Sequence, residues 1–138
     1  MNVKTLLLAL GLWQGRTILS EASMRQQKYQ AAETYARNVG KPLLVVGGPY
    51  GTSPLRRIFH YRAHGCGDYC VDLDPFACRG CPNFIQADIR NIPLPTGSMG
   101  AALASHVIEH LPTVEDANQA ISELRRVADR VFVASPLM

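Results

Sequence analysis

LLVVGGPYG, residues 43–51, joins a short apolar run to a turn that carries glycines. A second apolar run, residues 69–71, ends at an acid, Asp72, about 20 residues further on. Glycines let backbone N–H groups come close to a bound cofactor, and an acid at that distance accepts hydrogen bonds from a ribose diol. The stretch is therefore typical of a nucleotide-binding βαβ unit.

Outward from this unit, strand-like apolar runs alternate with amphipathic helices. The predicted strands cover residues 43–46, 69–72, 83–87, 101–104 and 131–134. The predicted helices cover residues 25–39, 53 to about 65, and 113–129. This alternation predicts an α/β fold, a Rossmann-like three-layer αβα sandwich with a mostly parallel sheet of about five strands. The carboxyl ends of the strands then bring residues 47–51, 72–74, 88–89 and 105–110 to one edge.

Each predicted helix carries apolar side chains at helical spacing, which we expect to be buried. These stripes are Ala32, Tyr35, Ala36 and Val39 in the first helix, Leu55, Ile58 and Phe59 in the second, and Ala117, Ile121, Leu124 and Ala128 in the third. Ser53, followed by Pro54, is the expected N-cap of the second helix, and Thr113 begins a capping-box-like sequence in the third.

The chain has 138 residues, which is enough for one domain with a single core. We expect a helical lead-in over residues 1–40 and a Rossmann-like domain over residues 41–138. The formal charge of +3 is scattered, apart from Arg56, Arg57 and Arg62 on one predicted helix. A nucleic-acid-binding surface normally needs more clustered charge, so we do not expect such a partner.

The N-terminus joins Lys4 to a short apolar run over residues 5–13. Because a transmembrane helix needs about 20 apolar residues, this run is too short to span a bilayer. It predicts a packing helix, with peripheral membrane attachment through residues 1–16 or a signal sequence as the alternatives. We expect a cytoplasmic protein, with a peripheral membrane location as the alternative.

Four cysteines lie within a short segment, at Cys66, Cys70, Cys78 and Cys81. Four thiolates would suit a tetrahedral zinc ion, but the C-x₃-C half of the pattern is weaker than a paired C-x₂-C ribbon. The spacing therefore leaves three interpretations open. They are a zinc site, one disulfide or redox pair, and ordinary reduced cysteines.

Residues 43–136 resemble a class I S-adenosylmethionine-dependent methyltransferase of the type 11-like small-molecule family. The resemblance depends on DIRNIPLP at residues 88–95, SMGAALASHVIEHL at residues 98–111 and ELRRV at residues 123–127. It implies S-adenosylmethionine as the cofactor and a small-molecule substrate as the methyl acceptor.

The resemblance also implies a role for particular residues. The expected cofactor-binding residues are Gly47, Gly48 and Gly51 at the methionine part, Asp72 at the ribose, Leu73, Asp88 and Ile89 at the adenine, and Ser105 at the end of the fourth strand. His106 and His110 are the candidates for a catalytic base, because histidine is the side chain that ordinarily exchanges a proton near neutral pH.

Two positions in the glycine turn depart from the family pattern. Val45 stands where the family carries an acid, and Pro49 stands where it carries a glycine. Proline has no N–H group and a fixed φ, so it cannot donate to a ligand there. This difference leaves a second hypothesis open, a non-catalytic cofactor-binding or protein-interaction module. A nicotinamide-dependent dehydrogenase fits less well, because the G-x-G-x-x-G pattern fails at its second and third glycines.

The family's final pair of strands is also missing from the predicted sheet. The last predicted strand, residues 131–134, therefore has an unpaired edge. Unpaired edges promote association, so we expect cover by the N-terminal helices or by a second subunit in a homodimer.

Overall fold

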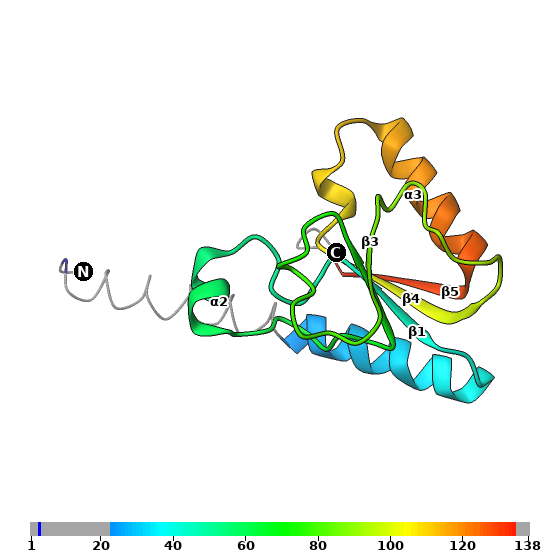
Figure 1. Cartoon of the computed structure of the whole chain (residues 1–138), viewed down its shortest axis with the longest axis horizontal. Helices are drawn as coiled ribbons and strands as arrows, with labels where there is room; N and C mark the ends of the chain where they lie inside the picture. The colour runs from blue at the N-terminus through cyan, green and yellow to red at the C-terminus, as the bar shows by residue number, and fades with distance from the viewer. Residues whose placement is uncertain (1–2, 4–22, 135–138) are drawn as a thin grey trace.

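The computed structural model describes residue 3 and residues 23–134 (Figure 1). Within these residues lies an open sheet of five strands in the order β3-β2-β1-β4-β5. The strands are β1 (Leu43–Val46), β2 (Tyr69–Asp72), β3 (Phe84–Gln86), β4 (Met99–Ser105) and β5 (Ala128–Ala134). Every neighbouring pair is parallel. The α/β fold with a parallel five-stranded sheet is therefore confirmed.

Helices cover the two faces of the sheet and complete the three layers (Figure 1). On one face, the helix over residues 23–39 packs Ala32 and Ala36 against Leu43 and Val45 of β1. On the other face, α3 (Val114–Val127) lies over β4 and β5, and its buried residues share one core cluster with Leu44 and Val46, the alternate residues of β1. Successive side chains of a strand point to opposite faces, so a central strand covered on both sides is apolar throughout.

The helix α3 begins as the sequence predicts and ends earlier. The Thr113 hydroxyl accepts a hydrogen bond from the Asp116 N–H at 3.1 Å, which caps the first turn. The predicted end at residue 129 is wrong, because Ala128 is already extended and pairs with Met99 of β4. Pairing with β4 therefore overrides helical periodicity at this junction. The buried residues of α3 are Ala120, Leu124 and Val127, a set that shares only Leu124 with the predicted stripe.

The second predicted helix differs most from expectation. The helix α2 (Pro54–Phe59) has six residues and buries none of them. Leu55, Ile58 and Phe59, the predicted buried stripe, are 67%, 68% and 74% exposed. The adjacent face of the sheet is already filled by the helix over residues 23–39 and by the cysteine-bearing segment, so α2 lies off the core. Ser53 is the N-cap residue, but its side chain makes no capping hydrogen bond.

The N-terminal part is described only from residue 23 onward, apart from Val3. In the helix over residues 23–39, Ala32 and Ala36 are buried as predicted. Val39, at the last helical position, is exposed, because the helix ends there at Gly40. The apolar run of residues 5–13 lies outside the described residues. Of the helices that the structure does describe, none is long and apolar enough to cross a membrane.

Candidate functional site

The carboxyl ends of neighbouring strands bring several predicted cofactor-binding residues together. The strand β1 leads into the glycine turn, β2 ends at Asp72, and β4 ends at Ser105. A Cβ on Gly47 would lie 2.9 Å from the Ser105 carbonyl oxygen. The Gly48 N–H donates to the Asp72 carboxylate at 2.8 Å. The glycine turn therefore contacts the ends of both strands that flank β1.

Each backbone N–H group of residues 47–51 already donates to an acceptor in the protein. The acceptors are the Val71 carbonyl for Gly47 (3.0 Å), the Asp72 carboxylate for Gly48 (2.8 Å), the Ala77 carbonyl for Tyr50 (3.1 Å) and the Gly48 carbonyl for Gly51 (3.0 Å). Pro49 has no N–H group. In this conformation every N–H donor of the turn is bonded to an acceptor within the protein, so none of them is available to a ligand.

A covering loop, residues 73–81, closes over the turn from the end of β2. The rings of Phe76 and Tyr50 lie 5.8 Å apart, and Pro49 is less than 2% exposed. A Cβ on Gly48 would lie 2.2 Å from the Ala77 carbonyl oxygen. The loop backbone therefore comes so close that only glycine fits at this position.

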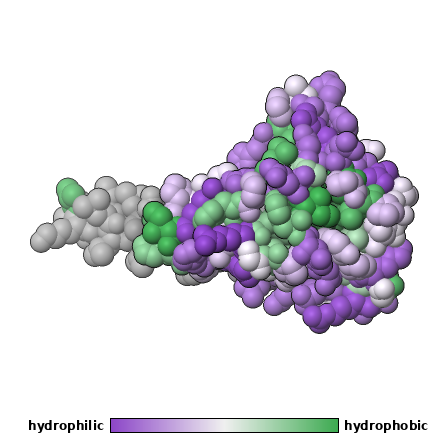
Figure 2. Space-filling model, in the orientation of Figure 1, coloured by the Kyte–Doolittle hydropathy of each residue, from purple (hydrophilic) through white to green (hydrophobic). Residues whose placement is uncertain are grey.

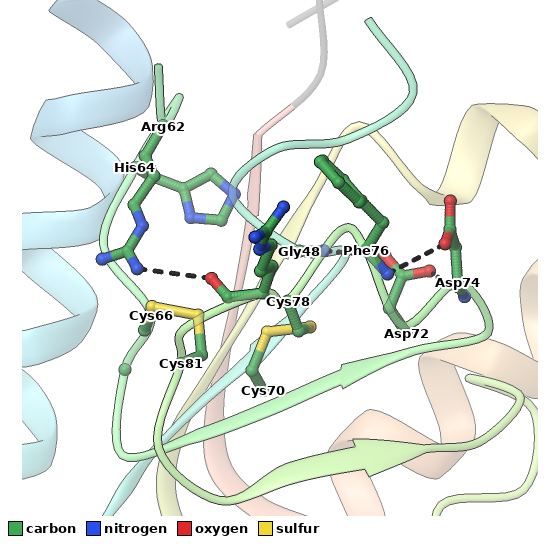
Figure 3. Close-up of a disulfide and its surroundings, with 12 residues drawn as sticks. Gly48, Arg62, His64, Cys66, Cys70, Asp72, Asp74, Phe76, Cys78 and Cys81 are labelled. Carbon is green, nitrogen blue, oxygen red and sulfur yellow. Dashed lines mark hydrogen bonds between the residues drawn. A yellow bond between two sulfur atoms is a disulfide. The ribbon is translucent and has the colours of Figure 1, made fainter. Parts of the chain in front are cut away.

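Two disulfides hold the covering loop in place (Figure 3). Cys70 in β2 is bonded to Cys78, and Cys66 is bonded to Cys81. The loop folds back over β2 and brings the Cα atoms to 6.2 Å in the Cys70–Cys78 pair and to 5.4 Å in the Cys66–Cys81 pair, separations that a disulfide spans. The interpretation of these residues as reduced cysteines is therefore wrong, and their thiolates are not available to zinc. The described residues hold no group of three or more His, Cys, Asp or Glu side chains placed to bind a metal ion.

Asp72 ties the glycine turn to the covering loop. Its Oδ2 accepts from the Gly48 N–H and its Oδ1 accepts from the Asp74 N–H, each at 2.8 Å. A carboxylate has about four lone-pair positions, so Asp72 keeps capacity for the hydroxyl groups of a ribose. Beside it, Leu73 is 63% exposed and offers an apolar surface to a flat base.

Arg57 links α2 to the covering loop. Its guanidinium donates to Asp74 and to the Gly51 carbonyl, and it lies 4.8 Å from the centre of the Phe76 ring. The hydrogen bond from Arg57 lowers the pKa of Asp74. The sequence groups Arg57 with Arg56 and Arg62 on one predicted helix and does not point to its partner, because nothing local marks a residue 17 positions away.

Asp88 follows β3 and is held by an arginine that the sequence analysis did not single out. The Arg90 guanidinium donates to both Asp88 oxygens, at distances from 2.6 to 3.2 Å, and to Asp116 of α3 at 2.9 Å. The hydrogen bond from Arg90 lowers the pKa of Asp88. Ile89, a predicted adenine contact, is buried in the core. The carboxylate of Asp88 is thus fixed in its charged state at the sheet edge.

The predicted base candidates differ in their surroundings. His106 follows β4, where its Nε2 accepts a hydrogen bond from Arg25 Nε at 2.8 Å and its Nδ1 lies 3.3 Å from a Glu109 oxygen. Abstraction of a proton at Nε2 therefore requires Arg25 to withdraw. His110, at the end of the 3₁₀ helix η1 (Ile108–His110), is exposed. Arg25 carried no signal in the sequence, because its partner is 81 residues away.

These residues fit the two halves of S-adenosylmethionine differently. Asp72, Leu73 and Asp88 present acceptors and an apolar surface suited to adenosine. The turn expected at the methionine part is covered by the loop that carries Ala77. A hollow between α3 and β5 is lined by Ile121, Arg125 and Val131 among others, and it contains none of the predicted site residues. The carboxyl edge of the sheet is accordingly the better candidate for the cofactor site.

Comparisons with known proteins agree with this fold. A family model described as a methyltransferase domain matches residues 51–130, which is more than half of the 138-residue chain. The match begins at the last glycine of the turn, so it leaves out Val45 and Pro49, the two departures from the family pattern. A search of curated proteins gave no match. The chain therefore belongs to the methyltransferase domain family, and its parallel sheet fits the class I S-adenosylmethionine-dependent members.

Proposed function

We propose that this chain transfers a methyl group from S-adenosylmethionine to a small-molecule acceptor. The observation that carries the proposal is the placement of Asp72 at the carboxyl end of β2 and of Asp88 just beyond the carboxyl end of β3, two neighbouring parallel strands. Ligands of open α/β sheets bind outside these carboxyl ends. One carboxylate is suited to a ribose diol and the other to the exocyclic amine of adenine, through charge-assisted hydrogen bonds.

Bound S-adenosylmethionine supplies an activated methyl group, so the protein's task is mainly to position donor and acceptor. Asp72 would accept hydrogen bonds from the ribose hydroxyls of the bound cofactor, and Leu73 would offer its exposed apolar surface to the adenine. Arg90 keeps the Asp88 carboxylate charged and oriented. Where the acceptor must lose a proton, His106 takes it at Nε2 after Arg25 withdraws.

The methionine part of the cofactor needs a change in the covering loop. The N–H groups of Gly48 and Tyr50 are bonded to Asp72 and Ala77. Residues 76–78 must therefore move aside before the turn can donate to a ligand. The two disulfides limit this movement, so we expect the oxidation state of the cysteines to affect cofactor affinity.

The occupied N–H groups of the glycine turn favour a second candidate function, a module that binds the cofactor or a partner without catalysis. Val45 and Pro49 remove an acid and a donor that the family pattern supplies, and the remaining donors of the turn are satisfied within the protein. A domain of this kind would keep the sheet and lose the transfer reaction.

Calorimetric titration of the full chain with S-adenosylmethionine and with its demethylated product tests both candidates. We expect both ligands to bind, and Asp72→Asn to weaken binding at least about tenfold, because it removes a charged acceptor from the ribose. Asp68→Asn, at a carboxylate that holds the Leu43 N–H at the opposite end of β1, is the matched control. No binding of either ligand at millimolar concentration, with the cysteines oxidised or reduced, would overturn the proposal.

Transfer of a labelled methyl group separates the enzyme from the module. Incubation of the chain with S-adenosylmethionine labelled on its methyl group and with a small-molecule extract should label an acceptor if the chain is an enzyme. Binding of the cofactor without transfer would instead support the non-catalytic module.

A further inference from the structure

The surface of α2 combines exposed apolar side chains with positive charge. Leu55, Ile58, Phe59 and Tyr61 are each more than 60% exposed. We call these four residues the α2 patch. In Figure 2 hydrophobic residues over α2 lie next to hydrophilic ones. Large apolar side chains gathered on one exposed segment mark an interaction surface more often than a solvated face.

The chain segment that contains the α2 patch carries charged side chains of positive sign only. No Asp or Glu occurs between Glu33 and Asp68, a stretch that contains Arg56, Arg57 and Arg62. Of these arginines, Arg57 is paired with Asp74 of the covering loop. The guanidinium of Arg62 lies 5.7 Å from the centre of the Tyr50 ring and donates to a backbone carbonyl.

One further arginine, Arg25, lies near enough to α2 to act on Arg56. Burial lowers the pKa of Arg56, and the nearby charge of Arg25 lowers it further. The positive charges of Arg25 and Arg56 also lie close enough to His64 to lower its pKa, in addition to the larger effect of burial. The α2 end of the molecule is thus cationic as well as apolar.

We propose that the α2 patch docks on the surface of an anionic phospholipid bilayer. Aliphatic and aromatic side chains insert at the boundary between headgroups and acyl chains, while neighbouring arginines contact the anionic headgroups. The long arginine side chains keep their charge in the headgroup layer while the α2 patch leaves water.

Two alternative partners, a soluble polyanion and a second copy of the chain, fit this surface less well. A soluble polyanion such as a nucleic acid would satisfy the arginines but would leave four large apolar side chains without cover. A second copy of the chain, related by a two-fold axis through the patch, would bring the same arginines of both copies together. An anionic bilayer provides both an apolar layer for the α2 patch and negative charge for the arginines.

The proposal does not depend on methyl transfer, although it has a consequence for the candidate site. The helix α2 follows the glycine turn at the carboxyl end of β1. A bilayer docked on α2 therefore lies beside the sheet edge that carries Asp72 and His106.

Flotation of the full chain with vesicles tests the proposal. We expect binding to vesicles of phosphatidylcholine mixed with phosphatidylglycerol, and binding at least about tenfold weaker to phosphatidylcholine alone. The double variant Ile58→Ser/Phe59→Ser should weaken binding to the mixed vesicles at least about tenfold. The control Val114→Ser removes a side chain that is 73% exposed in α3, away from α2 (Figure 1), and should bind like the wild type.

The urea midpoint of each variant should equal that of the wild type, because the replaced side chains are exposed. Absence of vesicle binding by the wild type would overturn the proposal. Unchanged binding of the double variant would also overturn it, because attachment would then depend on another part of the chain. Binding to a short DNA duplex that the double variant retains, without binding to mixed vesicles, would assign the surface to a soluble polyanion instead.

Discussion

Replacement of Asp72 by asparagine tests how the glycine turn and the covering loop are held together. The two carboxylate oxygens accept from two different backbone N–H groups, those of Gly48 and Asp74, both at 2.8 Å. In Asp72→Asn one oxygen remains, and the NH₂ group replaces the other and faces a donor. One of the two backbone N–H groups therefore loses its acceptor.

The expected loss of stability in Asp72→Asn follows from the type of hydrogen bond removed. A hydrogen bond to a charged acceptor contributes about 1.5–3 kcal/mol, and a donor left unsatisfied costs about 1–3 kcal/mol when buried. Because the site is only partly buried, we expect Asp72→Asn to lower the free energy of unfolding by about 2–3 kcal/mol.

Asp68→Asn is the matched control for this variant. The Asp68 carboxylate accepts from one backbone N–H group, that of Leu43, through Oδ2 at 2.8 Å. The amide oxygen of asparagine can keep this bond, so we expect a loss below about 1 kcal/mol. Urea unfolding followed by circular dichroism measures both variants. Equal losses in the two variants would contradict the proposed double role of Asp72.

Three further predictions concern the covering loop and the charged groups around it. Gly48→Ala should lower the free energy of unfolding by about 1–3 kcal/mol, because its Cβ would lie 2.2 Å from a loop carbonyl oxygen; an unchanged urea midpoint would contradict this contact. Cys70→Ser/Cys78→Ser opens a disulfide with a sequence separation of 8, so loop-closure entropy predicts a loss of about 2.5 kcal/mol and faster amide hydrogen exchange at Gly48. Equal exchange in the wild type and the double variant would show that the disulfide does not hold the loop. The pKa values of Asp74 and Asp88 are lowered by arginines in the folded state, so their stabilising contribution is present above the unfolded pKa, near 3.8, and is lost as the pH falls through the lower folded values. Thermal unfolding between about pH 6 and pH 2.5 should show this loss, and a constant midpoint would refute it.

The order of the strands along the chain could be predicted from local patterns. Continuous apolar runs at residues 43–46 and 101–104 indicate strands covered on both faces, and both are buried in the sheet. The Thr113 cap could also be predicted, because it depends on residues three positions apart. The positions of Asp72 and Asp88 after their strands follow from the same local reasoning.

Interactions between distant residues could not be predicted in this way. Helical spacing predicted burial of Leu55, Ile58 and Phe59, but whether a stripe is buried depends on which segments occupy the face of the sheet. The contact between Arg90 and Asp116 joins residues 26 positions apart, and neither carries a local signal for the other.

Local sequence patterns are sufficient to predict the α/β class, the strands and the acids at their carboxyl ends, because these features depend on the spacing of neighbouring residues. Three-dimensional packing decided that the covering loop closes over Gly48 and that the four cysteines form two disulfides. It also decided that α2 keeps its apolar side chains in solvent. These features depend on competition for the same surface between segments far apart in the chain, and the outcome of that competition is set by packing in three dimensions.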